Sequence, residues 1–419
     1  MKSINVSSKR LTIKLSTLIS CILMALSVSV YFIGLDGMGT IEFLISLSIM
    51  LFGFNNYRMA KVLPIAVLTF FVLLMLVLSG KMGQTGFNAP IKHALKFVHL
   101  LFAFVCFSFF NYGANIKQKK FFVITVLLAA AISCIQSIYL VFAGNDYAIR
   151  YASRYGFSAE GVAGFSQIYG IPALVLIVSS TLFNDRKKTF WQKVLLILLL
   201  GIFFYFIGVS LFTTALLLTV LGIVFFMFLK MLRRDARTTL IIMMASIVLA
   251  LMIIFVFSDQ TMSLIKDLTS GMNYISRDRI QFIAGKLLLV SSDLTYSYDR
   301  RLELAGYSLQ TFEDNPFFGV GYFEYGYGVI GCHQEWADLL GVFGLFGSTI
   351  VIIVLLGMFA SLFRVLKTQE EKDLFFVLIT MFIVLGFLNP CLGSPFLLAL
   401  FVVMPNAKYL FYSETENKF

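Results

Sequence analysis

The sequence predicts an all-α polytopic membrane protein with about twelve transmembrane helices and both termini in the cytoplasm. Of its 419 residues, 59% are apolar and only 13% are charged, whereas soluble domains average roughly 45–50% and 25%. The apolar residues come in runs of about 20, the length at which a helix crosses a ~30 Å hydrocarbon core. Basic residues gather between alternate runs, as expected for cytoplasmic loops.

Twelve apolar runs are candidate spans. They fall at 12–34, 39–55, 62–80, 93–110, 121–143, 165–183, 194–208, 210–229, 238–257, 337–363, 373–389 and 394–411. The run 194–208 is short and only Val209 separates it from the next, so we expect a tight turn with Gly208 and Ser210 as turn residues. The first run is too long for a signal peptide and no small-residue cleavage site follows it, which indicates an uncleaved anchor.

The charges test this number of spans. With the N-terminus inside, 22 of the 33 Lys and Arg residues and 7 of the 22 acids face the cytoplasm. The inner side then carries +15 and the outer side −4, which together give the net +11. Losing one span of the pair at 194–229 would misplace every later basic cluster. The positive charge therefore indicates orientation, and we expect no nucleic-acid partner.

We expect a single integral membrane domain over 1–419. Its longest connection is an outer, periplasmic loop at 258–336 between the ninth and tenth spans. Such long loops are usually functional or disordered, and its aromatic content and helical patterning favour ordered short amphipathic helices. The five cysteines lack a paired framework, so we expect small buried side chains.

A basic pair marks the first candidate site. The stretch DRRLELAGYSLQTFE at 299–313 predicts an amphipathic helix with Asp299 as its N-cap. Its apolar face would comprise Leu302, Ala305, Leu309 and Phe312. Arg300 and Arg301 would lie in the first turn, where the helix dipole disfavours cations. Free amides and two guanidiniums would bind a phosphate there, and an ordinary ion pair is the alternative.

An aromatic stretch follows this helix. It reads NPFFGVGYFEYGYGVIG at 315–331, and Pro316, Gly319 and Gly321 predict tight turns. Its Phe and Tyr rings, Tyr322 among them, would either hold sugar rings or form an interfacial aromatic belt. Both interpretations stay open at this point.

The segment HQEWAD at 333–338 leads into the tenth span. His333, flanked by carboxylates such as Glu335, is suited to accept a proton near neutral pH, although a structural role is commoner for such a residue. No second His lies at ligand spacing, no Asp-x-Asp occurs, and the one Glu-x-Glu lies in the inner tail, so we expect no metal site. Farther on, Gly341, Gly344 and Gly347 recur every three residues and predict close helix approach.

Two more outward-facing arginines lie in the segment 144–164. Arg150 and Arg154 are four residues apart, so a helix would place both on one side. An anionic ligand at the outer leaflet would explain basic residues there, and snorkelling to lipid headgroups is the alternative. The spans lack the mid-membrane charges that mark many ion-coupled transporters.

Three motifs in 301–347 resemble those of the O-antigen ligase and O-antigen polymerase superfamily of bacterial envelope enzymes. RLEL at 301–304, NPFFGVG at 315–321, and His333 followed by LLGVFGLFG at 339–347 are similar to the family's GRLELW, NPLFGVG and HNxxLxxLxExGxxG, in the same order and spacing. Arg154 begins a weaker match to an outer-loop RxxG. The sequence departs from the family at Gln334, where Asn is usual, at Ala305, where Trp is usual, and after Ser210, where the expected Arg is absent.

The resemblance implies glycosyl transfer from a polyprenyl diphosphate carrier at the outer face of the bacterial cytoplasmic (inner) membrane, without a metal, nucleotide or other cofactor. Arg301 would be catalytic and, with Arg154, Arg150 and Arg300, would hold the diphosphate. His333 would be the general base, and Tyr322 and Glu335 would contact the substrate. The implied partners are an undecaprenyl diphosphate-linked oligosaccharide, membrane lipid and a chain-length regulator protein.

Several functions fit this sequence. The first is a polysaccharide repeat-unit polymerase that makes O-antigen or a capsule-like polymer. The second is an O-antigen ligase that transfers the finished glycan to lipid A-core, and nothing in the sequence separates the two. Twelve spans also fit a transporter or flippase of lipid-linked glycans, and a non-catalytic assembly protein is a further alternative.

Overall fold

A computed structural model describes the helical parts of the chain. The described residues are 18–19, 21–22, 25–26, 96–112, 114–142, 165–184, 188–210, 212–234, 262–263, 265–267, 270, 277, 281, 296–321, 330–331 and 333–411. The predicted spans 39–55, 62–80 and 238–257, and most of the first one, lie outside these residues.

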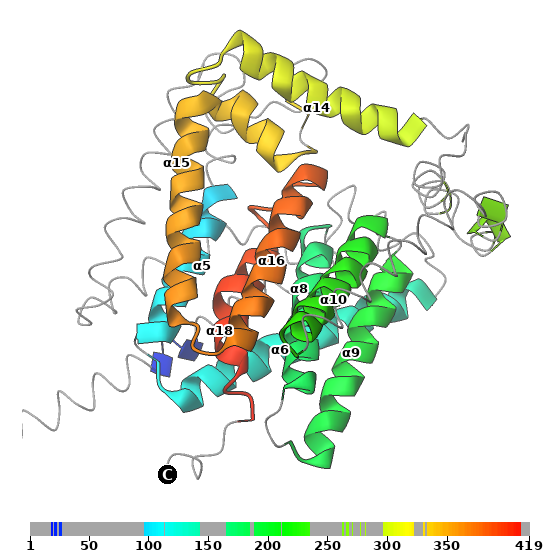
Figure 1. Ribbon diagram of the computed structural model, residues 1–419, viewed down its shortest axis with the longest axis vertical. Helices are drawn as coiled ribbons and strands as arrows, with labels where there is room; N and C mark the ends of the chain where they lie inside the picture. Colours follow the sequence, from blue (N-terminus) through cyan, green and yellow to red (C-terminus); the bar gives the residue numbers. More distant parts are fainter. Residues whose placement is uncertain are drawn as a thin grey trace, which may run out of the picture.

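Within these ranges the protein is all-helical (Figure 1). The elements are α5 (Lys96–Tyr112), α6 (Ile116–Phe142), α8 (Phe165–Phe183), α9 (Phe190–Ser210), α10 (Thr213–Arg234), α14 (Tyr296–Asp314), α15 (Glu335–Val365), α16 (Gln369–Leu388), α17 (Pro395–Leu398), the π-helical turn η2 (Ala399–Val403) and α18 (Met404–Ala407). The other eight predicted spans coincide with these helices. Among the described residues, four segments are long and apolar enough to cross a bilayer: Ile116–Leu140, Phe190–Ser210, Thr214–Arg233 and Glu335–Val365. The all-helical membrane class is confirmed, while the number of spans and the topology stay predictions.

The pair predicted at 194–229 is indeed two helices, but its turn lies elsewhere. Helix α9 continues through Gly208 and Ser210, and α10 starts at Thr213. The Ser210 hydroxyl donates to the Ile207 carbonyl at 2.8 Å within the helix. In an apolar environment a continued helix satisfies more backbone groups than an early turn does, so the prediction of Gly208 and Ser210 as turn residues was wrong.

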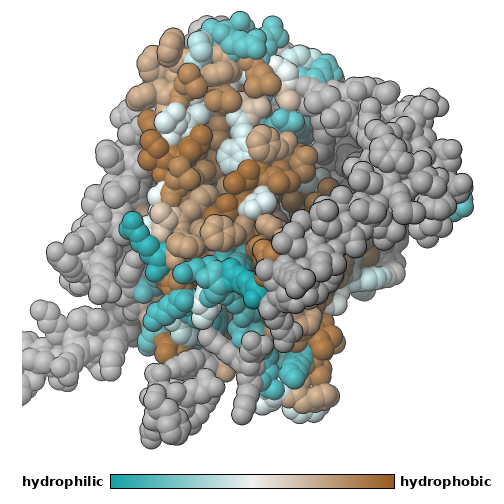
Figure 2. Space-filling view, in the orientation of Figure 1, coloured by the Kyte–Doolittle hydropathy of each residue, from teal (hydrophilic) through white to brown (hydrophobic). Residues whose placement is uncertain are grey.

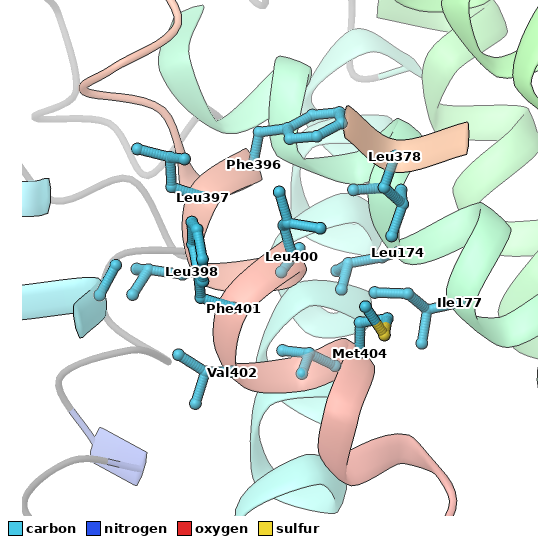
Figure 3. Close-up of a cluster of buried hydrophobic side chains, with 14 of the residues drawn as sticks. Leu174, Ile177, Leu378, Phe396, Leu397, Leu398, Leu400, Phe401, Val402 and Met404 are labelled. Carbon is cyan, nitrogen blue, oxygen red and sulfur yellow. The ribbon is translucent and has the colours of Figure 1, made fainter. Parts of the chain in front are cut away.

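The last helical segment, α17–η2–α18, is buried on all sides. Every residue from 395 to 407 is buried, and Figure 3 shows Leu174 and Ile177 of α8 and Leu378 of α16 beside Leu400 and Met404. The Phe401 ring stacks on Phe359 of α15, with the centroids 5.6 Å apart. A helix that is apolar all round belongs in a core, and α5, α8, α15 and α16 pack around this one.

Polar residues collect at the two ends of the helix bundle, and an apolar band separates them (Figure 2). We name the end that carries α14 the outer end and the opposite one the inner end, following the predicted orientation. At the inner end, α10 and the residue that follows α18 form ion pairs with α16. These pairs are Lys230–Glu370 at 3.6 Å, Lys408–Glu371 at 3.1 Å and Arg233–Asp373. All six residues are ones that the charge count assigns to the cytoplasmic side, which agrees with the alternation of the spans from α10 onward.

Candidate functional site

Helix α14 lies across the outer end of α15 (Figure 1). It begins at Tyr296, three residues before the predicted N-cap Asp299. The N-cap prediction was therefore wrong, and Arg300 and Arg301 lie in the second turn rather than the first. The free amides of a helix are those of its first four residues, here 296–299, so they do not coincide with the basic pair. The side chains of Arg300 and Arg301 lie outside the described part of the structure, and phosphate binding by their guanidiniums stays a prediction.

The buried face of α14 differs from the predicted apolar face. Ala305, Ser308 and Thr311 are buried, whereas Leu309 is 44% exposed. The helix thus buries a partly polar face, on which Ser308 has a polar partner on α15, Asp338. Arg301 precedes Ser308 by seven residues, two helical turns, so the two backbone positions lie on the same side of α14.

One hydroxyl joins three segments at the outer end. Ser308 donates from Oγ to Oδ1 of Asp338 in the first turn of α15 at 2.6 Å, and accepts from the Gly331 amide at 2.9 Å. Ser308, Gly331 and Asp338 are all buried, so these bonds are shielded from water. Gly331 also lies against α14, since a Cβ there would be 1.9 Å from the Leu304 carbonyl oxygen. The turn that carries His333, two residues later, is therefore fixed to the helix that carries Arg301.

The first turn of α15 is also held by α16 and the turn after it. Glu335 is buried, and its Oε2 accepts from the amides of Cys391 at 2.7 Å and Leu392 at 3.1 Å. Trp336 donates from Nε1 to the Ile383 carbonyl at 2.9 Å, and its ring lies on Gly386, where a Cβ would come within 2.3 Å. Burial, together with the Glu335 carboxylate, raises the pKa of the Cys391 thiol well above its usual range, so this thiol stays protonated.

Helix α15 is broken at Gly344, which has φ +60° and ψ −166°. The loop that contains NPFFGVG satisfies the backbone groups on both sides of the break. The bonds run from the Val320 amide to the Gly341 carbonyl (3.1 Å), Gly321 to Val342 (2.8 Å), Leu345 to Pro316 (2.8 Å) and Phe346 to Phe317 (3.0 Å). Buried backbone groups outside a regular helix require such protein partners, so loop and helix form one unit.

The glycines of these motifs permit this close approach. Gly319 has φ +63°, and a Cβ there would lie 2.3 Å from the Val342 carbonyl oxygen. A Cβ at Gly344 would lie 2.5 Å from the backbone of Phe317, and one at Gly341 would lie 2.8 Å from the Ser308 carbonyl oxygen. Close approach is confirmed for Gly341, whose neighbour is α14. The repeat at 341, 344 and 347 does not mark one continuous helical face, however, because the helix is interrupted at its middle member.

The structure locates some of the predicted site residues. His333 is exposed in the turn before α15, and Glu335 is buried with its carboxylate on the 391–392 turn. Arg300 and Arg301 are placed by their backbone alone. Arg150, Arg154 and Tyr322 lie outside the described residues, so their roles stay predictions.

Ser308 and its hydrogen bond to Asp338 were not predicted from the sequence, in which Asp338 was noted only as a carboxylate near His333. The only available signal was a serine on an otherwise apolar helix face and an acid at the start of a span. Among the described residues, no group of three or more His, Cys, Asp and Glu side chains is placed to hold a metal ion.

One known protein family matches the part of the chain that contains α14, the NPFFGVG loop and the turn with His333. Residues 196–352 match the family model described as O-antigen ligase. The matched segment runs from α9 into α15 and includes α14, the NPFFGVG loop and the turn with His333. No curated protein matches the chain. The family match confirms the resemblance to the O-antigen polymerase and ligase superfamily that the motifs in 301–347 predicted.

Proposed function

We propose that the protein is a repeat-unit polymerase of the bacterial inner membrane. It transfers a glycan from a polyprenyl diphosphate carrier, undecaprenyl diphosphate in the simplest case, to an acceptor sugar hydroxyl at the outer face, without a metal. One observation carries the proposal. The Ser308 hydrogen bonds join the helix of Arg301 to the turn of His333, within the segment that matches the O-antigen ligase family.

The chemistry requires two groups near each other. As the acceptor oxygen forms its bond to the anomeric carbon, the bond from that carbon to the carrier diphosphate breaks and the diphosphate leaves with the electron pair. His333 accepts the hydroxyl proton as general base. Arg301, supported by Arg300, Arg150 and Arg154, neutralises the charge that develops on the leaving diphosphate, and losing such a contact costs ~2–4 kcal/mol in the transition state.

The surroundings of His333 suit a general base. Its side chain is exposed and thus accessible to an acceptor, while the turn on which it lies is fixed on both sides. The Gly331 amide is bonded to Ser308 on one side, and Glu335 is bonded to the 391–392 turn on the other. A base on a rigid element keeps its orientation through turnover. Tyr322 would contact a sugar ring. The Glu335 carboxylate is buried, so a substrate would contact it only by reaching the edge of that buried region.

Purified full-length protein in nanodiscs, given a defined lipid-linked repeat unit and a chelator, tests this function directly. We expect a ladder of longer products, and we expect Arg301→Ala and His333→Ala to lose most of it while inserting normally. Lys266→Ala, which removes an exposed cation of the same loop, is the matched control. Wild-type ladders from both site variants would show that the site assignment is wrong, and a ladder only without chelator would show that a metal is needed.

An O-antigen ligase is the second candidate, and the family match is compatible with it as well as with the polymerase. The two functions differ in the phenotype of a gene deletion. Loss of long chains with a single repeat still attached to lipid A-core indicates a polymerase, whereas no attached glycan indicates a ligase. A flippase would instead move the lipid-linked glycan across a proteoliposome membrane without extending it. Co-purification from membranes would test for a chain-length regulator.

A further inference from the structure

We propose that Phe317 and Phe318 insert into the outer leaflet of the bilayer. They act as an aromatic anchor that sets the height of α14 and the NPFFGVG loop relative to the membrane. The occupant of this surface is the acyl-chain and headgroup boundary of the lipid. The inference is independent of the proposed transfer reaction, because it concerns the surface on which the NPFFGVG loop rests.

Four large apolar side chains from two segments form an exposed patch. Phe317, Phe318, Phe346 and Leu345 are 68%, 66%, 55% and 49% exposed. The rings of Phe318 and Phe346 lie 5.9 Å apart. Exposed apolar groups of this size mark an interaction surface rather than a water-facing one.

The patch continues the exposed flank of α15. Below Phe346, this helix exposes four more large apolar side chains, those of Ile352, Ile353, Leu356 and Phe363. These positions lie on one side of the helix and form one stripe along it. Figure 2 shows the apolar band of the molecule's surface. A stripe of this length faces lipid in a membrane protein, so the patch lies at its outer end.

The depth of the patch follows from helix geometry. Residues 345–365 rise roughly 30 Å at ~1.5 Å per residue, which equals the ~30 Å thickness of the hydrocarbon core. Exposed Arg364 lies at the inner end of this segment, and exposed Lys367 lies two residues beyond it. The break at Gly344 therefore falls at the outer boundary of the hydrocarbon. The bonds from Leu345 to Pro316 and from Phe346 to Phe317 hold the loop at the same height, where aromatic rings are favoured.

The polarity of the exposed residues changes abruptly just before Phe317 and Phe318. Glu313, Asp314 and Asn315 are exposed at the end of α14, and these residues require water. Within two positions the chain thus passes from an aqueous surface to the lipid-facing stripe. A sugar-binding role for these two rings would require an aqueous surface around them, whereas their exposed neighbours are Leu345 and Phe346. For Phe317 and Phe318, these neighbours favour an interfacial aromatic belt over a sugar-binding surface.

Spin labelling of the full-length protein in phosphatidylethanolamine–phosphatidylglycerol nanodiscs tests the anchor. Phe317→Cys and Phe318→Cys are labelled with a nitroxide in a Cys332→Ser background, because the other four cysteines are buried. The measurement is the ratio of label collisions with oxygen, which partitions into lipid, to collisions with a water-soluble nickel chelate. Asp314→Cys is the aqueous control and Leu356→Cys the lipid control. We expect ratios at 317 and 318 several-fold above that at 314 and approaching that at 356.

Two results would overturn the proposal. A ratio equal to that of Asp314→Cys places the rings in water, as a sugar-binding surface requires. Low collision rates with both reagents place them under another protein segment. Phe346→Cys reports on the same patch without altering the loop, so it keeps the test valid if the loop variants misfold. A water-accessible label at 346 contradicts the anchor equally.

Discussion

The outer and inner ends of the helix bundle are held together by different chemistry. At the outer end, α14, the NPFFGVG loop, α15 and α16 meet through backbone amides, buried carboxylates and glycines that leave no room for a Cβ. At the inner end, α10 and α16 meet through long charged side chains, and Lys230 and Arg233 are each 37% exposed. Contacts of the first kind fix one geometry, whereas the second kind tolerates sliding and is screened by salt. Of the site residues predicted from sequence, His333 and Glu335 lie at the outer end.

The largest expected effect is at the break in α15. Gly344→Ala forces a residue with a side chain to φ +60° and brings its Cβ to 2.5 Å from the Phe317 backbone. Strain and overpacking together should cost more than ~3 kcal/mol, measured as lost thermal stability and yield in detergent. Gly357→Ala, in the same helix with nothing within 4 Å of the new Cβ, is the control and should be neutral or slightly stabilising. Similar losses in both variants would contradict a special role for the break.

A smaller effect is expected where one hydroxyl joins three segments. Asp338→Ala leaves the buried Ser308 hydroxyl without its acceptor, which should cost ~1–3 kcal/mol. Asp338→Asn keeps an acceptor oxygen and should retain most of the stability. Hydrogen exchange of the peptide that contains Gly331 measures the effect locally, and we expect faster exchange in Asp338→Ala than in Asp338→Asn. Unchanged exchange in both variants would mean that the hydroxyl does not hold the His333 turn.

At the inner end the most consequential variant is Arg233→Ala. Asp373 is nearly buried while its partner is partly exposed, so the carboxylate would lose its closest cation but water would reach part of the space. We expect ~1 kcal/mol, measured by chemical unfolding. The double variant Arg233→Ala with Asp373→Asn should recover part of the loss, since it removes the uncompensated charge. A double variant less stable than the single one would contradict this account.

The smallest expected effect is that of Lys230→Ala. Its ion pair with Glu370 spans 3.6 Å between partly exposed side chains, and such pairs contribute ~0–1 kcal/mol. The loss should shrink as salt is raised, whereas the loss in Gly344→Ala should not change. A salt-independent loss of several kcal/mol at Lys230 would remove the contrast between the two ends.

The parts of this fold that composition decides were predictable. Helices α6, α9 and α15 are apolar runs long enough to cross a bilayer, and a helix satisfies the backbone groups of such a run within the segment itself. The start of α14 was misplaced because Tyr296 and Ser297 carry no clear helix signal, whereas Asp299 looks like a cap. The break at Gly344 was not visible, because a glycine repeat also fits an unbroken helix and only the contact with Phe317 distinguishes the two.

The candidate site shows the same limit. His333 and Arg301 were predicted as site residues because an imidazole and a guanidinium in an outer loop can carry out acid–base chemistry and bind an anion. Ser308 and Asp338 were not, because a serine on a helix face acquires its meaning from a partner thirty residues away. Local periodicity carries no information on such a pairing, which depends on how α14 crosses α15.

The enclosed segment α17–η2–α18 has a consequence for biosynthesis. It follows, in chain order, each of the helices α5, α8, α15 and α16 that surround it. Until this segment leaves the ribosome and enters the membrane, residues such as Leu174 and Phe359 on these helices lack the side chains against which they pack in the folded protein. The protein therefore reaches its native packing only after residues 395–407 have been synthesised and inserted, and a chain stalled before residue 395 would expose these uncovered helix surfaces to the proteases of membrane quality control.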